Sequence, residues 1–127
     1  MIPLVNVPLI DYTIELLAGA DVKEIFIFCG GGTKGQQVME HVRASRWNKS
    51  VKLHYIEGDK SVGDCLRECD DMRTDGKINE KGDLIVVTGP VVANYELAAV
   101  LAKHKAHKKR DKASILTCSL KRLSQVR

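Results

Sequence analysis

The amino-acid sequence predicts an α/β fold in which helices alternate with the strands of a mostly parallel, doubly wound sheet. Helical and strand patterns alternate four times along the 127 residues. Residues 83–88 (DLIVVT) are apolar almost throughout, as expected of a central parallel strand that is covered on both faces. A hydrophobic fraction of 44% and a charged fraction of 28% are typical of globular proteins, and the length predicts one domain over residues 1–127.

The first predicted elements are a helix and a strand. Apolar residues recur at spacings of three and four over residues 9–20, which predicts a helix with one buried face, and Pro8 suits its first turn. Residues 24–29 (EIFIFC) are β-branched or aromatic and precede glycines, which predicts a strand. Doubly wound nucleotide-binding folds begin with a strand, so we expect either another strand order or a chain cut from a longer protein.

A second helix and strand are predicted in the next part of the chain. Thr33 and Gln36 have capping-box spacing, and apolar residues at Val38 and Val42 would form the inner stripe of a helix up to Ser45. Apolar and polar residues then alternate over residues 51–56, which predicts a strand with one wetter face, close to an edge of the sheet.

The third helix is predicted over residues 61–72, with Ser61 as its N-cap. Its inward-facing residues would be Val62, Cys65, Leu66 and Cys69. Residues 73–82 are polar and contain glycine, which predicts a loop before the strand at residues 83–88. A fourth helix is expected over residues 95–109, capped by Asn94 and followed by a strand at residues 113–118.

The cysteines and the lengths of the apolar runs indicate the cell compartment in which the protein is expected. Cys29, Cys65, Cys69 and Cys118 form no C-x-x-C pair, which favours free thiols in the core of a cytosolic protein. No apolar run approaches the roughly 18 to 20 residues that span a bilayer, and no basic region precedes the apolar start of the chain. We therefore expect neither membrane insertion nor secretion.

Gly30, Gly32 and Gly35 form a G-x-G-x-x-G pattern between a predicted strand and a predicted helix, and Glu57 ends the next strand. Such glycines let backbone N–H groups approach a pyrophosphate, while the acidic residue bonds a ribose hydroxyl. The pattern therefore leaves open a nucleotide- or dinucleotide-binding enzyme. The alternative interpretation is a flexible strand-to-helix turn without a ligand.

The remaining polar clusters favour no metal site, catalytic residue or cofactor. The aspartates at positions 59, 64, 70, 71 and 75 lack the spacing of a calcium loop, and the four histidines lack partners for zinc. Positive charge is concentrated near the C-terminus, at Lys103, Lys105, Lys108, Lys109, Arg110 and Lys112. This cluster predicts either a solvated helix end or an RNA-binding module through residues 103–112.

Several segments resemble one protein family, and they do so in order along nearly the whole chain. These segments are residues 3–17 (PLVNVPLIDYTIELL), 22–29 (VKEIFIFC), 41–47 (HVRASRW), 61–67 (SVGDCLR) and 83–94. Together they resemble the nucleotidyltransferase-like domain of the epsilon subunits of the guanine-nucleotide exchange factor for translation initiation factor two. The resemblance implies a Rossmann-like core in a cytoplasmic multi-subunit complex. The expected partners are the homologous subunits and initiation factor two.

The resemblance also implies that this chain is not an enzyme by itself. In the family the exchange step belongs to a C-terminal helical domain, whereas this domain serves assembly and regulation. Active nucleotidyltransferases hold magnesium with a Gly-Asp pair after the central strand, and here the pair reads Gly89-Pro90. Because a proline side chain offers no oxygen to a metal ion, we expect a degenerate pocket, formed by Gly63, Asp64, Gly89 and Pro90.

Overall fold

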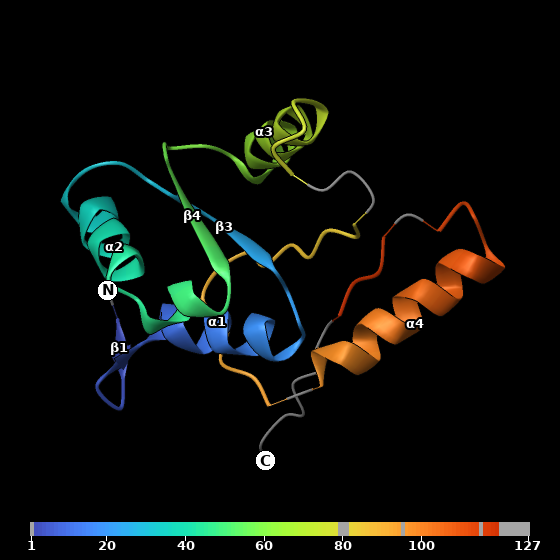
Figure 1. The fold of residues 1–127 in the computed structure, drawn as a ribbon, viewed down its shortest axis with the longest axis horizontal. Coiled ribbons are helices and arrows are strands. Elements are labelled where there is room, and N and C mark those ends of the chain that lie inside the picture. The colour runs from blue at the N-terminus through green and yellow to red at the C-terminus, as the bar shows by residue number, and fades with distance from the viewer. Residues whose placement is uncertain (1, 79–81, 95, 115, 120–127) are drawn as a thin grey trace, which may run out of the picture. The chain divides into compact units, whose positions relative to one another are not determined.

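The computed structural model describes residues 2–78, 82–94, 96–114 and 116–119 (Figure 1). It divides into two compact units, Met1–Ala93 and Asn94–Arg127, which are described separately. Among the described residues, the first unit contains a short hairpin, three α-helices, a 3-10 turn and a pair of parallel strands, and the second contains one helix. Among the described residues, no helix has the length and hydropathy needed to cross a bilayer.

The first unit opens with a hairpin that the sequence did not predict. Strands β1 (Pro3–Leu4) and β2 (Val7–Pro8) pair antiparallel, and the turn residues Val5 and Asn6 have φ values of 49° and 62°. A β-branched residue rarely adopts a positive φ, so Val5 holds a strained backbone conformation. Large aliphatic side chains are exposed here at Ile2, Leu4, Val5 and Val7.

Helix α1 (Leu9–Gly19) confirms the first predicted helix, and Pro8 occupies its N-cap. Its inner face carries Ile14, which is 1% exposed, and Leu17, which is also buried. The Thr13 hydroxyl donates to the Val91 carbonyl oxygen at 3.2 Å, and the Val91 N–H donates to Thr13 Oγ1 at 2.7 Å. These two bonds hold the irregular segment, defined as residues 82–93, against the helix.

The centre of the first unit is a β-α-β arrangement, as predicted. Strands β3 (Glu24–Cys29) and β4 (Lys52–Glu57) are parallel and in register from Glu24 opposite Lys52 to Cys29 opposite Glu57. Helix α2 (Thr33–Arg43) and the 3-10 turn η1 (Arg46–Lys49) connect them. Ile25 of β3 and Val42 of α2 are buried, which places the core of the first unit around this connection.

The predicted cap of α2 is wrong. Thr33 is already the first residue of the helix, the N-cap is Gly32, and no side chain caps this end. The helix begins one residue earlier than predicted because Gly32 has a φ of 81°, a conformation that favours glycine, and so occupies the N-cap position itself.

Helix α3 (Val62–Thr74) begins at its predicted N-cap, Ser61, but the predicted inner face is wrong. No residue of α3 is buried, and Val62 and Leu66 are exposed, whereas Cys65 and Cys69 are half-buried. The helix therefore packs on the unit with only part of its apolar stripe, and it depends on local contacts for its stability.

The strands predicted at residues 83–88 and 113–118 do not form. The described residues between 82 and 94 contain no helix or strand, and Leu84 and Val86 are exposed. The second prediction is wrong for residues 113, 114 and 116–118, and residue 115 lies outside the described residues. A strand requires a hydrogen-bonded neighbour. The part of the chain that the structure describes thus has an α/β architecture with one parallel strand pair.

Helix α4 (Leu97–Arg110) of the second unit confirms the fourth predicted helix. Leu97 is buried, and Val100 and Leu101 are half-buried, as the predicted inner stripe requires. The predicted cap is wrong, because the N-cap is Glu96 rather than Asn94 and no side chain caps the helix. Tyr95, the predicted first residue, lies outside the described residues.

Candidate functional site

The glycine turn, defined as residues 30–35, lies at the carboxyl end of β3 and includes the first residues of α2. The carboxyl ends of parallel strands are where open α/β sheets place their ligands. Glu57 ends β4 directly opposite Cys29, so the predicted acidic residue lies at the same edge as the glycines. The structure therefore brings together Gly30, Gly32, Gly35 and Glu57.

Gly35 is the position at which the absence of a side chain matters most. It is buried, and a Cβ built on it would lie 2.1 Å from the Gly30 carbonyl oxygen and 2.9 Å from the Tyr55 hydroxyl. A contact of 2.1 Å to backbone is impossible without a shift of the chain. Gly35 thus permits the close packing of α2 on the preceding turn, which is the role of the third glycine in a dinucleotide fingerprint.

The N-terminus of α2 exposes backbone donors toward the same turn. Gly32 has no side chain to cap the helix, and the first turn contains no acidic residue but does contain Lys34. Unsatisfied N–H groups and the helix dipole at such an end favour an anion. This part of the geometry agrees with the predicted phosphate-binding role.

Two carboxylates lie against the turn and oppose an anion there. A Cβ built on Gly30 would lie 2.5 Å from Asp59 Oδ1, and one built on Gly31 would lie 3.4 Å from Glu57 Oε1. Two negative charges beside the turn repel a pyrophosphate, although either carboxylate could accept a hydrogen bond from a hydroxyl group. The turn is therefore better suited to hydroxyl groups than to phosphate.

The side chains beneath the turn retain their protons. Burial raises the pKa of the Cys29 thiol, and burial followed by the charges of Cys29 and Glu57 raises the pKa of Tyr55. The Tyr55 hydroxyl is buried without a hydrogen-bond partner among the described residues. A protonated thiol is a poor nucleophile, so Cys29 is unsuited to covalent chemistry. All four cysteines are free, but none is fully buried, so the prediction of core thiols is only partly right.

Two relatives match nearly the whole chain. The translation initiation factor eIF2B subunit epsilon of Dictyostelium discoideum is 35% identical over 128 residues, covering 98% of this chain and 17% of the relative. The subunit of the same name from Schizosaccharomyces pombe is 37% identical over 129 residues, covering 98% of this chain and 18% of the relative. The chain is homologous to one segment of eIF2B epsilon. It spans less than one fifth of the length of these relatives. No protein-family model matches it.

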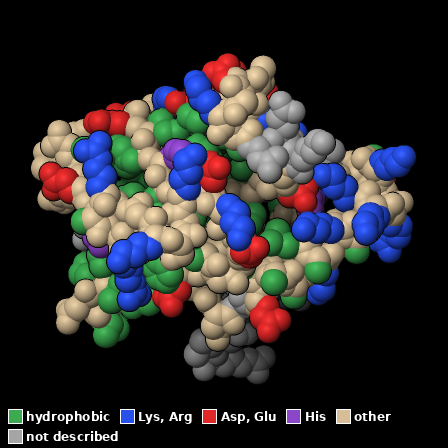
Figure 2. All heavy atoms as spheres, viewed as in Figure 1, with side chains coloured by type: hydrophobic (Ala, Val, Ile, Leu, Met, Phe, Trp, Pro, Cys, Tyr) green, Lys and Arg blue, Asp and Glu red, His purple; other side chains and the backbone are tan. Residues whose placement is uncertain are grey.

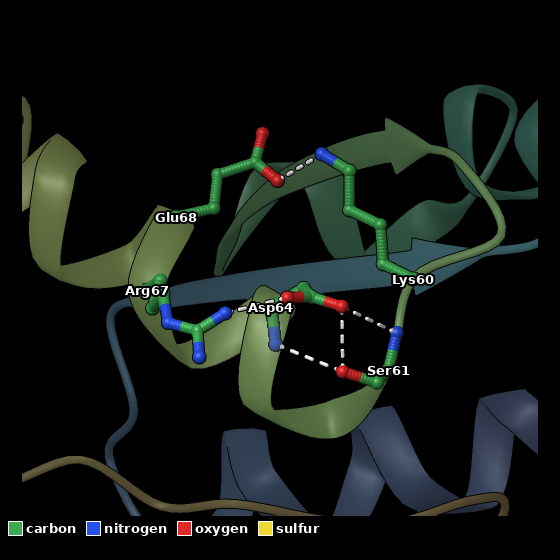
Figure 3. Close-up of polar contacts among 5 residues, drawn as sticks. All are labelled: Lys60, Ser61, Asp64, Arg67 and Glu68. Carbon is green, nitrogen blue, oxygen red and sulfur yellow. Dashed lines mark hydrogen bonds and ion pairs between the residues drawn. The ribbon is translucent and has the colours of Figure 1, made fainter.

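In the predicted degenerate pocket, formed by Gly63, Asp64, Gly89 and Pro90, the carboxylate of Asp64 has a structural role (Figure 3). Ser61 Oγ donates to Asp64 Oδ2 at 2.6 Å, and the Asp64 N–H donates to Ser61 Oγ at 3.2 Å. The Asp64 carboxylate also accepts from Arg67 at 2.7 Å, and Lys60 pairs with Glu68 beside it. The bonds from Ser61, chiefly that from its hydroxyl, lower the pKa of Asp64. Asp64 is thus engaged in capping α3.

The glycines of the degenerate pocket do not pack against one another. A Cβ built on Gly63 would meet only Ser61 Oγ, at 3.7 Å, and one built on Gly89, whose φ is 141°, would meet no atom within 4 Å. Pro90 follows Gly89 in the irregular segment. Among the described residues, no group of three or more His, Cys, Asp or Glu side chains is placed to hold a metal ion.

Sequence reasoning missed Asp59 and Tyr55 as neighbours of the glycine turn. Tyr55 lies two residues before Glu57 in β4, so both side chains point to the same face of the strand pair, and this alternation could have identified it. Asp59 follows the end of the strand, where the turn at Gly58 has no pattern that fixes its direction. The signal for Asp59 is only its position at the carboxyl end of β4.

Proposed function

We propose that this chain acts in translation initiation, as a non-catalytic module for assembly or regulation of the guanine-nucleotide exchange factor that acts on initiation factor two. The observation that carries the proposal is the match to eIF2B epsilon over 98% of the chain at 35% and 37% identity. The proposed partners are the homologous subunits of that factor and initiation factor two itself, in the cytoplasm.

The proposed fold is a single, partial nucleotidyltransferase-like domain with a Rossmann-like core. The β3-α2-β4 arrangement supports it, because a parallel pair joined by a helix is the building unit of doubly wound sheets. In such a sheet residues 83–88 would be a further strand. Exposure alternates along these residues, because Leu84, Val86 and Thr88 are exposed and Ile85 and Val87 are half-buried, and this alternation is compatible with pairing in a larger assembly.

A role without chemistry of its own is supported by the residues at the degenerate pocket. Pro90 replaces the acidic residue that active nucleotidyltransferases would use for magnesium, and Asp64 is committed to the N-terminus of α3. The carboxylates of Asp59 and Glu57 beside the glycine turn disfavour a phosphate ligand. The homology likewise favours the translation role over a dinucleotide-dependent enzyme.

A role in assembly is supported by apolar side chains at the surface of the first unit. Besides the hairpin residues, exposed large aliphatic side chains occur in the irregular segment at Leu84, Val86 and Val92. Clusters of exposed apolar residues mark surfaces that bind other proteins. The irregular segment is therefore the proposed contact with a homologous subunit.

A nucleotide-exchange assay tests the proposal. Purified initiation factor two loaded with fluorescent GDP is mixed with the full 127-residue chain, and release of the nucleotide is followed. We expect the spontaneous rate, together with measurable binding of the chain to purified homologous subunits. Leu84→Asp should abolish that binding, whereas Gln37→Glu, which adds one negative charge at an exposed polar residue of α2 outside the irregular segment, should leave it intact. Faster GDP release with the chain alone, or no binding to any subunit, would refute the proposal.

A further inference from the structure

The second part of α4 and the two residues after it carry a strong excess of positive charge. Six Lys or Arg residues and one acidic residue, Asp111, occur between residues 103 and 112. This excess is larger than the net charge of +4 of the whole chain. Figure 2 shows Lys and Arg side chains gathered over α4. A patch of this density attracts polyanions.

The cations of α4 are arranged in two rows along its exposed side. Ala99, Ala102 and Ala106 are exposed and fall on one strip at helical spacing. Lys105 and Lys109, one turn apart, border one side of the strip, and Lys103 and Arg110, two turns apart, border the other. The opposite side of α4 carries the buried Leu97. The basic face is defined here as these four cations and three alanines.

The four cations of the basic face have no protein partner within the part of the chain that the structure describes. None of them forms an ion pair with a described residue, although cations of the first unit do, as Lys23 does with Asp21. All four are exposed. Their charges are therefore available to a ligand.

We propose that the basic face of α4 binds the backbone of double-stranded RNA. Two rows of cations on either side of a strip of small side chains match two phosphate strands on either side of a groove. The alanines let the helix approach the duplex closely, and the cations neutralise phosphates and release their counterions. Double-stranded RNA is recognised through its shape and backbone, which requires no base-specific side chain.

Other ligands fit the basic face less well. Binding of single strands relies on stacking of bases on aromatic side chains, and α4 contains no Phe, Tyr or Trp. Insertion into a membrane surface requires large apolar side chains on the exposed side, where α4 has alanines. The choice of RNA over DNA rests on the proposed function in translation. An acidic protein is the remaining alternative, and the experiment separates it from RNA.

Binding of the full 127-residue chain to a fluorescent RNA duplex, measured by anisotropy over a range of salt concentrations, tests the inference. Lys105→Gln/Lys109→Gln should weaken binding roughly tenfold or more and reduce the salt slope by about 2, because two phosphate contacts are lost. Arg43→Gln/Lys49→Gln removes the same charge at exposed positions of the first unit and should have little effect. Ala102→Glu should weaken binding without loss of helix, as circular dichroism would verify.

Each arm of the experiment either supports the inference or overturns it. Salt-dependent binding of duplex RNA, lost in the α4 variants and retained in the control, supports it. Binding of single-stranded RNA or duplex DNA with the same affinity overturns it. Complete displacement of the RNA duplex by an acidic polypeptide, added at the same total negative charge as the RNA, also overturns it. A chain that binds exchange-factor subunits but not RNA would refute this inference and leave the proposed function intact.

Discussion

At the scale of single residues, Gly35 shows how the chain positions its glycine turn. Its backbone packs so closely on Gly30 that a methyl group has no room, whereas Gly32 is needed for its positive φ. The two glycines thus serve different physical purposes within one turn. From the sequence the glycines were expected only to let backbone N–H groups approach a pyrophosphate, so neither of these two roles was predicted.

Gly35→Ala is expected to destabilise the chain by roughly 1–3 kcal/mol, because the new Cβ would displace the backbone at Gly30 in a packed region. Urea unfolding followed by circular dichroism measures the effect. Gly19→Ala, at the last residue of α1 where a Cβ would meet no atom within 4 Å, is the matched control and should be neutral or stabilising. Equal effects at both positions would refute the packing argument.

The carboxylates around the glycine turn were harder to predict than the glycines. Asp59 faces Gly30 only because the chain turns at Gly58, whose N–H donates to the Cys29 carbonyl oxygen at 2.9 Å. No spacing rule specifies how a loop folds back over a neighbouring turn. The sequence therefore predicted where the glycines and Glu57 meet but not that a second carboxylate, Asp59, lies beside them.

At the scale of elements, α3 depends on its own contacts rather than on burial. The capping box of Ser61 and Asp64 joins the start of the helix to its first turn, and no residue of α3 is buried. An isolated helix of this length is only marginally stable in water, so the loss of one cap should measurably lower its helical population. The sequence predicted Ser61 correctly because its side chain can bond the helix start, a local property.

Ser61→Ala is expected to reduce the stability of α3 by about 1 kcal/mol, because the Asp64 N–H loses its acceptor. Secondary chemical shifts of residues 62–74 in nuclear magnetic resonance spectra measure the helical population. Thr74→Ala, at the other end of the helix, is the control. An unchanged helical population in Ser61→Ala would contradict the local account of α3.

The same capping box predicts a dependence on pH. The Ser61 hydroxyl lowers the pKa of Asp64 below its ordinary value of 3.8, so the ionised carboxylate stabilises the folded helix. This contribution is complete above the unfolded pKa and is lost as the pH falls through the lower folded pKa. The α3 shifts should therefore move toward coil values in this acidic range in the parent chain and change less in Asp64→Asn.

Two segments with similar sequences show the limit of local prediction. Residues 24–29 (EIFIFC) and 83–88 (DLIVVT) are both short apolar runs, yet only the first is a strand, because β4 lies beside it. Strand formation depends on a neighbour that can be far away in sequence. The four α-helices of the described residues, whose hydrogen bonds are local, were predicted. The caps predicted at Thr33 and Asn94 are wrong, because Gly32 and Glu96 occupy those positions.

At the scale of the whole molecule, the described residues form a parallel sheet of only two strands, and the chain is similar to eIF2B epsilon along nearly its whole length. One parallel strand pair and several exposed aliphatic side chains are found in the first unit, while the match to eIF2B epsilon covers 98% of the chain but 17% and 18% of the relatives. Parallel sheets are normally larger and covered on both faces. Both observations agree with a module that is completed by contacts within a larger assembly.

The most direct test of this central claim is affinity purification of the endogenous protein from its source cells, followed by mass spectrometry of every retained protein. The account predicts recovery of other eIF2B subunits and of initiation factor two in stable proportions. Recovery of the protein without any of these partners, under conditions that keep the exchange factor intact, would contradict the account.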